Sequence, residues 1–252
     1  MEDSWAGFLL ANASGASVFE NVEFSNVSGI GKGPNPNGIK QNGWTLTGGI
    51  TVYNSPVEFR NCSFTNFKTE DALNIISSTF TISDCKFLDN YSDAFDGDFV
   101  VGNISESYFA NIAGDGVDFS GSSALLRNCF FKSVEDKAIS VGEGSKVKVS
   151  DCKIEDVSFG VVSKDMSATE VSDNTLVSDA KIAAFAAFQK KDSFGTASIK
   201  ITNSKTIGCP KLALIQENSQ GSFDGAIIQT VSFQSSDLYR TKEVKPTNAD
   251  RK

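Results

Sequence analysis

Short segments in which apolar and polar residues alternate recur along the chain at a nearly constant spacing. Alternation with a period of two is the pattern of a β-strand that buries one face. The shared pattern is apolar-x-apolar-x-Asn/Asp-Cys-x-Phe, and it repeats every 22 or 23 residues in VEFRNCSF (57–64), FTISDCKF (80–87), NISESYF (103–109), LLRNCFF (125–131), VKVSDCKI (147–154) and EVSDNTL (170–176). The pattern therefore predicts an all-β chain made of one repeated unit.

A repeated unit of this size cannot bury its apolar face alone, but stacked units share a continuous core. We therefore expect a parallel β-solenoid of about nine coils of 22–23 residues, with strands about 4.8 Å apart along the stack. One inward column is predicted to hold Phe64, Phe87, Phe109, Phe131, Ile154 and Leu176. The column two residues earlier holds Cys62, Cys85, Ser107, Cys129, Cys152 and Asn174, and its cysteines are expected to be free thiols.

Two segments interrupt the repeat, and a third follows it. The Gly/Pro/Asn-rich residues 30–43 and the lysine-containing residues 188–196 are predicted to be loop insertions. Residues 232–252 are polar and of mixed charge, which is typical of a flexible tail. We therefore expect one solenoid domain over residues 1–231, followed by this tail. Because the repeat begins without a polar cap, we also expect flanking domains of a longer chain.

Composition excludes several classes of function. The chain has no histidine, so Ser-His-Asp and Cys-His nucleophile pairs and imidazole metal ligands are impossible. A net charge of −8 and a pI near 4.7 argue against nucleic acid as a partner. The sequence contains no apolar stretch of membrane-spanning length and no signal-peptide pattern at its start. Any chemistry must therefore use carboxylates, amines, phenols or thiols.

The acidic residues are concentrated in one part of the chain, because residues 70–118 contain ten acids and one base. In the repeat register, one column holds Asp71, Asp93 and Asp115 and continues with Lys137. The column three residues later holds Asn74, Asp96, Asp118 and Ser140. Stacked carboxylates repel one another unless they are protonated, spread apart or bridged by a cation. The register thus predicts an acidic ladder on one face of the solenoid.

Calcium suits such a ladder, because Ca²⁺ takes carboxylate oxygens at about 2.3–2.6 Å and can be shared between adjacent coils. The predicted metal ligands are Asp71, Asp93, Asp96, Asp98, Asp115 and Asp118. The alternative is that these aspartates only form turns, since Asp hydrogen-bonds its own backbone and precedes glycine at two of these positions and alanine at two others. The sequence leaves both interpretations open.

The repeated V-x-F-x-N-C-x-F units resemble those of the right-handed parallel β-helix, the pectin-lyase-like superfamily, over about residues 17–230. The resemblance implies a single-stranded right-handed parallel β-helix. Members of this superfamily include pectate lyases, polygalacturonases, alginate epimerases and non-catalytic surface modules, so the fold does not select a function. It implies a polysaccharide or a cell-surface glycan as the partner, and an extracellular or cell-surface location.

Three functions remain open, in the following order of preference. The first is a carbohydrate-related module of a secreted or cell-surface protein, whose acidic ladder either binds a cation or only makes the turns polar and well hydrated. The second is a Ca²⁺-dependent lyase or epimerase of acidic polysaccharide, in which Lys137, or less favourably Lys164, is the base and Glu143 lies nearby. The third is a glycoside hydrolase that uses two carboxyl groups, although the histidine of polygalacturonases is absent.

Overall fold

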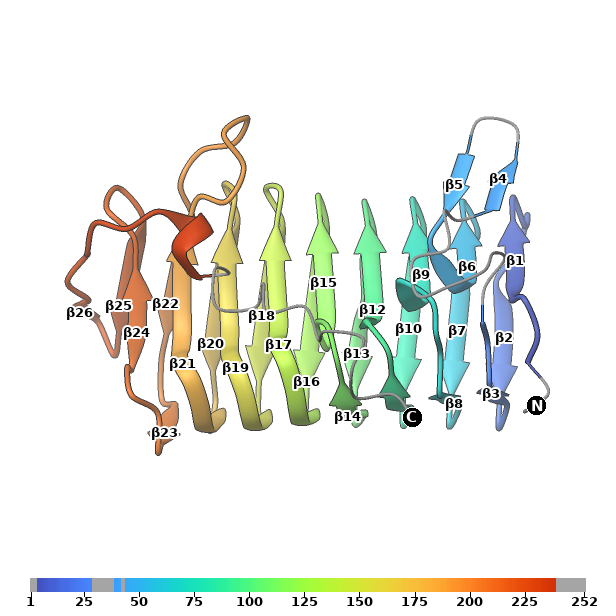
Figure 1. Ribbon diagram of the computed structural model, residues 1–252, viewed down its shortest axis with the longest axis horizontal. Helices are drawn as coiled ribbons and strands as arrows, with labels where there is room; N and C mark the ends of the chain where they lie inside the picture. The colour runs from blue at the N-terminus through green and yellow to red at the C-terminus, as the bar shows by residue number, and fades with distance from the viewer. Residues whose placement is uncertain (1–3, 29–38, 42–43, 239–252) are drawn as a thin grey trace, which may run out of the picture.

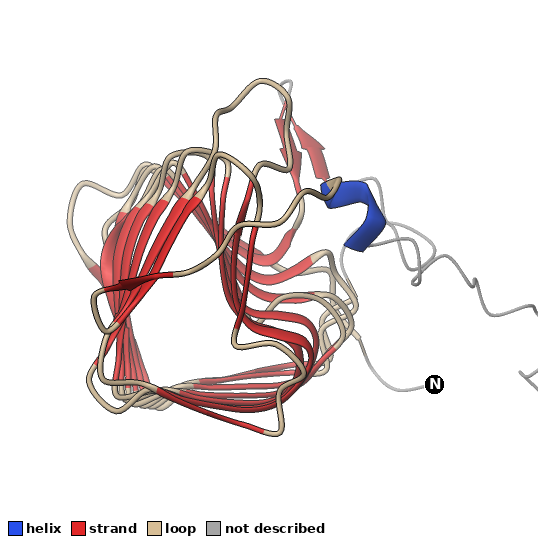
Figure 2. Cartoon of the chain, turned by 90° about the vertical axis from the view of Figure 1, so that its left-hand side faces the viewer, coloured by secondary structure: helices blue, strands red, loops and turns tan. Residues whose placement is uncertain are grey.

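The computed structural model describes residues 4–28, 39–41 and 44–238 of the chain. The chain winds into about eight turns of a parallel β-helix, so the predicted nine turns are one too many. Figure 1 shows the turns stacked from the N-terminal to the C-terminal end, and Figure 2 looks along the stack at the coil that they form. Among the described residues, no helix has the length and apolarity needed to cross a membrane.

Each turn contributes strands to three parallel sheets. Sheet 1 consists of β1 (Phe8–Ala11), β6 (Gly48–Tyr53), β9 (Asp71–Ile76), β12 (Asp93–Asp98), β15 (Val117–Ser120), β24 (Ala213–Ile215) and the C-terminal parts of β17 (Phe130–Gly142), β19 (Lys153–Lys164) and β21 (Leu176–Phe188). Sheet 2 consists of β2 (Ser17–Glu20), β7 (Val57–Arg60), β10 (Thr79–Ser83), β13 (Val101–Ser105), β16 (Ser123–Arg127), β18 (Lys146–Ser150), β20 (Ala168–Ser172), β22 (Ser198–Ile201) and β25 (Gln220–Phe223). Sheet 3 consists of β3 (Glu23–Ser25), β8 (Ser63–Thr65), β11 (Lys86–Asn90), β14 (Tyr108–Ile112), β23 (Lys205–Ile207) and the N-terminal parts of β17, β19 and β21.

Stacked aromatic rings fill the core, as the repeat predicted. Phe64, Phe87, Phe109 and Phe131 are in register and fully buried, and each ring lies parallel to the next with centroids 4.6–4.7 Å apart. The neighbouring column contains the four buried cysteines, and all five cysteines of the chain are free thiols. The Cys85 amide, for example, donates to Ser107 Oγ at 3.1 Å, so this column also satisfies buried backbone groups.

The Asn or Asp before each cysteine forms the turn between sheets 2 and 3. Asn61, Asp84, Asn128 and Asp151 all have a φ between 48° and 55°, in the left-handed region that Asn and Asp tolerate best. The repeated dipeptide is therefore explained by backbone geometry at this turn. The aspartates of the acidic ladder lie elsewhere, on sheet 1.

Three segments depart from the repeat. β4 (Ile39–Gln41) and β5 (Trp44–Leu46) form an antiparallel hairpin, whereas residues 30–43 were predicted to be a loop; residues 29–38 and 42–43 lie outside the described residues. Residues 189–196 form the predicted second loop. β26 (Ala226–Ile227) pairs antiparallel with β25, and η1 (Ser235–Leu238) follows it.

The polar tail begins later than predicted. Phe233 and Leu238 pack against buried apolar side chains of sheet 1, including Phe188 and Val162, so residues 232–238 belong to the folded domain. Figure 1 shows this segment in front of the C-terminal strands of sheet 1. Residues 239–252, the rest of the predicted tail, lie outside the described residues.

Candidate functional site

The acidic side chains gather on β9, β12 and the β15 region of sheet 1. We call this set the acid patch; it comprises Asp71, Asp93, Asp96, Asp98, Asp115 and Asp118. Asp71 and Asp115 are almost completely buried, and the other four are half-buried. The predicted columns are confirmed, because Asp71 pairs with Asp93 and Asp96 lies in register between Asn74 and Asp118.

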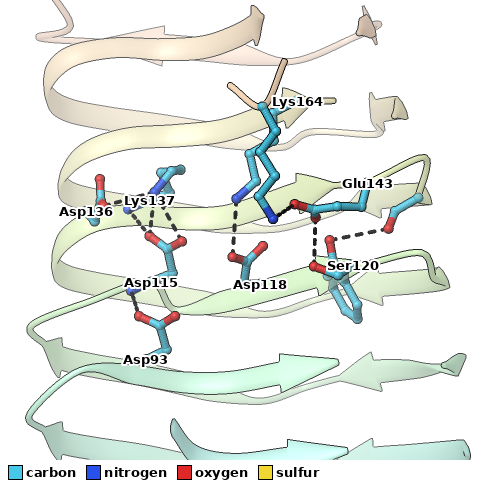
Figure 3. Close-up of polar contacts among 11 residues, drawn as sticks. Asp93, Asp115, Asp118, Ser120, Asp136, Lys137, Glu143 and Lys164 are labelled. Carbon is cyan, nitrogen blue, oxygen red and sulfur yellow. Dashed lines mark hydrogen bonds and ion pairs between the residues drawn. The ribbon is translucent and has the colours of Figure 1, made fainter. Parts of the chain in front are cut away.

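The first column is a ladder that ends on a buried lysine (Figure 3). Asp93 Oδ1 accepts the backbone N–H of Asp115 at 2.8 Å, and Asp115 Oδ1 accepts the backbone N–H of Lys137 at 2.9 Å. Lys137 Nζ then donates to both oxygens of Asp115, at 3.0 and 3.1 Å, and pairs with Asp136 at 2.9 Å. The Lys137 side chain is only 3% exposed, so the ammonium is a buried counter-ion to two carboxylates.

The second column carries a second buried lysine. Asn74 Nδ2 donates to Asp96 Oδ2 at 3.0 Å and approaches Asp98 Oδ2 at 3.4 Å. Lys164 Nζ reaches back to Asp118 Oδ2 at 3.2 Å, although its side chain is only 3% exposed. Gly142 makes this reach possible, because a Cβ there would lie 2.7 Å from Lys164 Cε. The patch thus contains lysine-paired carboxylates beside Asp96, which is hydrogen-bonded by a neutral amide.

Burial and mutual repulsion raise the pKa of most of these carboxyl groups. Burial raises the pKa of Asp71 to about 7, and nearby Glu70 and Asp98 add to the shift, against a hydrogen bond from Thr47. The pKa of Asp96 is raised well above its ordinary value by burial and then by the charges of Asp71, Asp98 and Asp118. Asp93, Asp98 and Asp118 shift in the same direction, again mainly through burial, although the charge of Lys164 opposes the shift of Asp118. Asp71 therefore shares a proton near neutral pH, and its neighbours Asp93, Asp96 and Asp98 are harder to ionise than an exposed aspartate.

These shifts predict how stability depends on pH. A carboxyl group with a raised native pKa keeps a proton that the unfolded chain releases above about pH 4, so the free energy of unfolding falls as pH rises from about 4 to 7. We expect a lower Tm at pH 8 than at pH 5, and we expect Asp71→Asn to remove about 1–3 kcal/mol of this difference. Thermal unfolding at both pH values measures it, with exposed Asp89→Asn as the control. A Tm that does not fall with pH would contradict the raised pKa values.

Glu143 lies at the turn that follows sheet 1. Its carboxylate accepts a hydrogen bond from Ser120 Oγ at 2.7 Å and pairs with Lys191. Burial raises the pKa of Glu143, but the hydrogen bonds from Lys191 and Ser120 and the charge of Lys164 outweigh it, so its pKa is lowered. Glu143 is therefore an ionised group at the edge of the acid patch.

A buried aspartate fixes the loop that carries Lys191. Asp165 Oδ1 accepts the backbone N–H groups of Lys190 and Lys191 at 2.6 and 2.8 Å, and Asp165 is completely buried. These bonds hold the start of the 189–196 loop against the turn after β19. The loop therefore brings a cation to the acid patch from a distant part of the sequence.

The structure brings together most residues that the sequence singled out. Lys137, Lys164 and all six aspartates lie on sheet 1 or directly before its strands, and Glu143 borders them. Sequence analysis missed Asp136, Lys191 and the role of Asn74 as a donor. The adjacency of Asp136 to Lys137 was a signal for the first, whereas nothing in the sequence indicates where the 189–196 loop points.

A metal ion fits part of the patch. Carboxylate oxygens of Asp93, Asp115 and Asp118 all lie within 4.8 Å of one another, which suits a bridging cation with oxygen ligands. However, the buried ammonium groups of Lys137 and Lys164 already neutralise Asp115 and Asp118. A bound cation would have to compete with both of them.

A separate groove lies on sheet 2, away from the acid patch. Its volume is about 940 Å³, and it follows outward residues of β13, β16, β18, β20, β22 and β25, such as Leu125, Lys148 and Lys200. None of the predicted site residues lines this groove. The predicted catalytic and metal-binding residues therefore all lie away from this groove, on or beside sheet 1.

Comparisons with known proteins agree with this architecture. Residues 77–228 match the model of the right handed beta helix region, and no curated protein matches the sequence. Similar solved structures include the catalytic domain of GH87 alpha-1,3-glucanase in complex with nigerose (13% identity, TM-score 0.46) and a variant of that domain in complex with tetrasaccharides (13%, 0.45). Each similarity covers 86% of this chain, which spans 55% of the other. Since the family model covers more than half of the sequence, the chain belongs to the right-handed β-helix family.

Proposed function

We propose that the acid patch cleaves glycosidic bonds of a polysaccharide by metal-free acid–base catalysis, with Asp96 as the proton donor and Asp118, beside the Lys164 ammonium, as the carboxylate that stabilises the developing positive charge. One observation carries the proposal: Asp96, a carboxyl group whose pKa is raised well above its ordinary value, lies in register with Asp118, whose carboxylate accepts a hydrogen bond from the buried Lys164 ammonium. Pairs of carboxyl groups whose environments separate their roles in this way are the usual basis of acid–base chemistry.

The two aspartates have different surroundings. Burial raises the pKa of Asp118, but the Lys164 ammonium, which donates a hydrogen bond to its Oδ2, opposes this shift and favours the charged form. Asp96 is surrounded by negative charge and bonded to Asn74, a residue only 1% exposed whose Oδ1 has no partner among the described residues. A half-turn of the Asn74 amide would let that oxygen accept the proton of a neutral Asp96. Asn74 is therefore suited to hold Asp96 in its protonated form.

In the proposed reaction, Asp96 gives its proton to the glycosidic oxygen as the C–O bond breaks. Positive charge develops at the anomeric carbon, and the carboxylate of Asp118 stabilises it until water attacks that carbon and gives a proton back to the Asp96 carboxylate. Adjacent parallel strands are about 4.8 Å apart, so the carboxyl groups on β12 and β15 can lie on either side of one sugar linkage. The arrangement needs neither a histidine nor a metal.

The lysines are less suited to the base role that the lyase alternative requires. Lys137 is buried between Asp115 and Asp136. Burial lowers the pKa of Lys164, but the charges of Asp118 and Asp115 outweigh it, so its pKa is raised, whereas a base at neutral pH needs a lowered one. Both lysines fit better as fixed counter-ions of the carboxylates.

The charge of the patch favours a neutral glycan. A polyuronate would bring further carboxylates to a face that already holds six, and this repulsion is unfavourable unless a cation reverses it. The outer face of sheet 1 is continuous over several turns, which suits a polymer. The resemblance to the pectin-lyase-like superfamily also supports a polysaccharide rather than a small metabolite.

The proposal is tested by incubating the protein in EDTA with laminarin, soluble starch, xylan and dextran, with polygalacturonate as the acidic comparison. New reducing ends from at least one neutral polymer, without the ultraviolet absorbance of an unsaturated product, are the expected result. Unsaturated product that depends on Ca²⁺ would instead support the lyase alternative. No product from any of the polymers would contradict catalysis.

The second candidate is a cation-binding glycan module, which the close approach of Asp93, Asp115 and Asp118 favours. If a site exists there, Ca²⁺ at 100 times its Kd should stabilise the fold by about 2.7 kcal/mol. Because two lysines compete with the ion, we expect calorimetric titration of chelator-stripped protein to detect no saturable binding and no rise in Tm. Saturable binding that Asp118→Ala abolishes would replace the hydrolase proposal with this one.

A further inference from the structure

One aromatic residue at the border of the acid patch has an unfavourable backbone conformation. Phe99 has a φ of 55°, in the left-handed region, where a bulky side chain is disfavoured. All other non-glycine residues with a positive φ in the described part of the chain are Asn, Asp, Ser or Glu, apart from Met166. A strained aromatic residue in a regular repeat calls for an explanation other than turn formation.

The neighbouring turns show what this position normally requires. In the same register, the preceding turn has Ser77, the following turn has Gly121, and the next two have Glu143 and Asp165, all with a positive φ. Small or polar residues therefore satisfy the backbone here. The phenyl ring adds nothing that the turn itself needs.

Packing does not explain the ring either. Phe99 is 67% exposed, so little of its apolar surface is removed from water. The ring lies over Gly121, because a Cβ on that glycine would be only 2.7 Å from two ring carbons. The glycine thus leaves space for a ring that lies on the turn and stays open to solvent.

The ring borders the candidate site. Phe99 directly follows Asp98, whose carboxylate approaches the Asn74 amide that also bonds Asp96. Glu143, at the edge of the patch, occupies the same turn position two turns further on, beyond Gly121. A sugar bound at the acid patch and extending towards the turn would meet the phenyl ring.

We propose that Phe99 is a stacking platform for one sugar ring of the glycan that binds at the acid patch, an inference that rests on the proposed function. The C–H groups on one face of a pyranose are apolar and weakly positive, and the face of a phenyl ring is negative. An exposed, fixed ring therefore suits this contact. Glycan binding then explains why a phenylalanine occupies a position that favours Asn or Gly.

The test uses the Asp96→Asn background, in which a bound oligosaccharide is not consumed. Cellotetraose, laminaritetraose, maltotetraose and xylotetraose are titrated by calorimetry. We expect at least one to bind, Phe99→Ala to weaken its affinity about five- to tenfold, and Phe99→Trp to preserve it within about twofold. Leu125→Ala, which removes a 54% exposed apolar side chain from sheet 2, is the matched control and should not change the affinity.

A stability measurement tests the strain independently of any ligand. Phe99→Asn should raise Tm by about 2–4 °C, because Asn tolerates the left-handed conformation, while it weakens glycan affinity as Phe99→Ala does. Unchanged affinity in Phe99→Ala, absence of binding for all four probes, or an unchanged Tm in Phe99→Asn would each overturn the platform.

The outcomes separate this inference from the proposed hydrolysis. If wild-type protein hydrolyses a glycan and Phe99→Ala does so equally well with equal affinity, the platform is wrong and the hydrolase stands. If binding depends on Phe99 but wild-type protein hydrolyses nothing, the platform stands on a glycan-binding module and the hydrolase is wrong.

Discussion

Asp96→Asn is expected to lower kcat for polysaccharide hydrolysis by about 10²–10⁴-fold, the usual contribution of a general acid. The substitution removes the transferable proton but keeps the size of the side chain and its ability to bond Asn74. On an aryl glycoside with an acidic phenol as leaving group, the loss should be smaller than about tenfold, because that bond breaks without protonation. Initial rates on both substrates measure the difference.

The control for this variant is Asp89→Asn, which changes an exposed aspartate of β11 that only accepts a hydrogen bond from Asn111. It should retain full activity on both substrates. If Asp96→Asn loses the same factor on the activated and the natural substrate, Asp96 is not the proton donor. An Asp96→Asn protein with wild-type activity would exclude any catalytic role for this residue.

Lys137→Met is expected to lower the free energy of unfolding by about 3–5 kcal/mol, or Tm by about 6–20 °C. Methionine fills most of the volume but leaves the buried carboxylate of Asp115 without its counter-ion. Asp136, which pairs with the same ammonium, loses this ion pair too. The cost arises because an uncompensated charge remains in the protein, and chemical denaturation measures it.

Two comparisons show whether that cost comes from the unpaired charge. Lys148→Met breaks the Lys148–Glu170 pair, both of whose side chains are more than half exposed, and should cost less than about 1 kcal/mol. Adding Asp115→Asn to Lys137→Met should recover most of the lost stability. A cost below about 1 kcal/mol for Lys137→Met would mean that the ammonium is not a structural counter-ion, and the lyase hypothesis would regain its base.

Much of the fold follows from one periodic signal. Once the offset of 22 or 23 residues is known, stacking places Phe87 between Phe64 and Phe109 and Asp96 beside Asp118, because parallel strands in adjacent turns pair in register. Departures from the period were not predictable. The β4–β5 hairpin and the packing of Phe233 on sheet 1 depend on contacts between segments outside the repeat.

The sequence predicted which residues form the candidate site, but not how their burial and ion pairs set their charges. The register alone placed Lys137 beside Asp115. Whether this lysine is a catalytic base or a structural counter-ion depends on how deeply it is buried, and the sequence does not show what covers the outer face of sheet 1. Lys164 reaches Asp118 across two turns only because Gly142 leaves room for it. The repeat register shows which residues are neighbours in a column. It does not show that a long side chain such as that of Lys164 can cross one turn to contact a residue of the turn beyond.

The most direct test of metal-free acid–base catalysis is the pH–rate profile of glycan hydrolysis by wild-type protein in EDTA. We expect a bell-shaped profile of kcat, whose two limbs report the linked titration of Asp96 and Asp118 in the complex with substrate. Addition of Ca²⁺ should leave the profile unchanged. Activity that is lost in EDTA and restored by Ca²⁺, with a rate that only rises towards alkaline pH, would contradict the account.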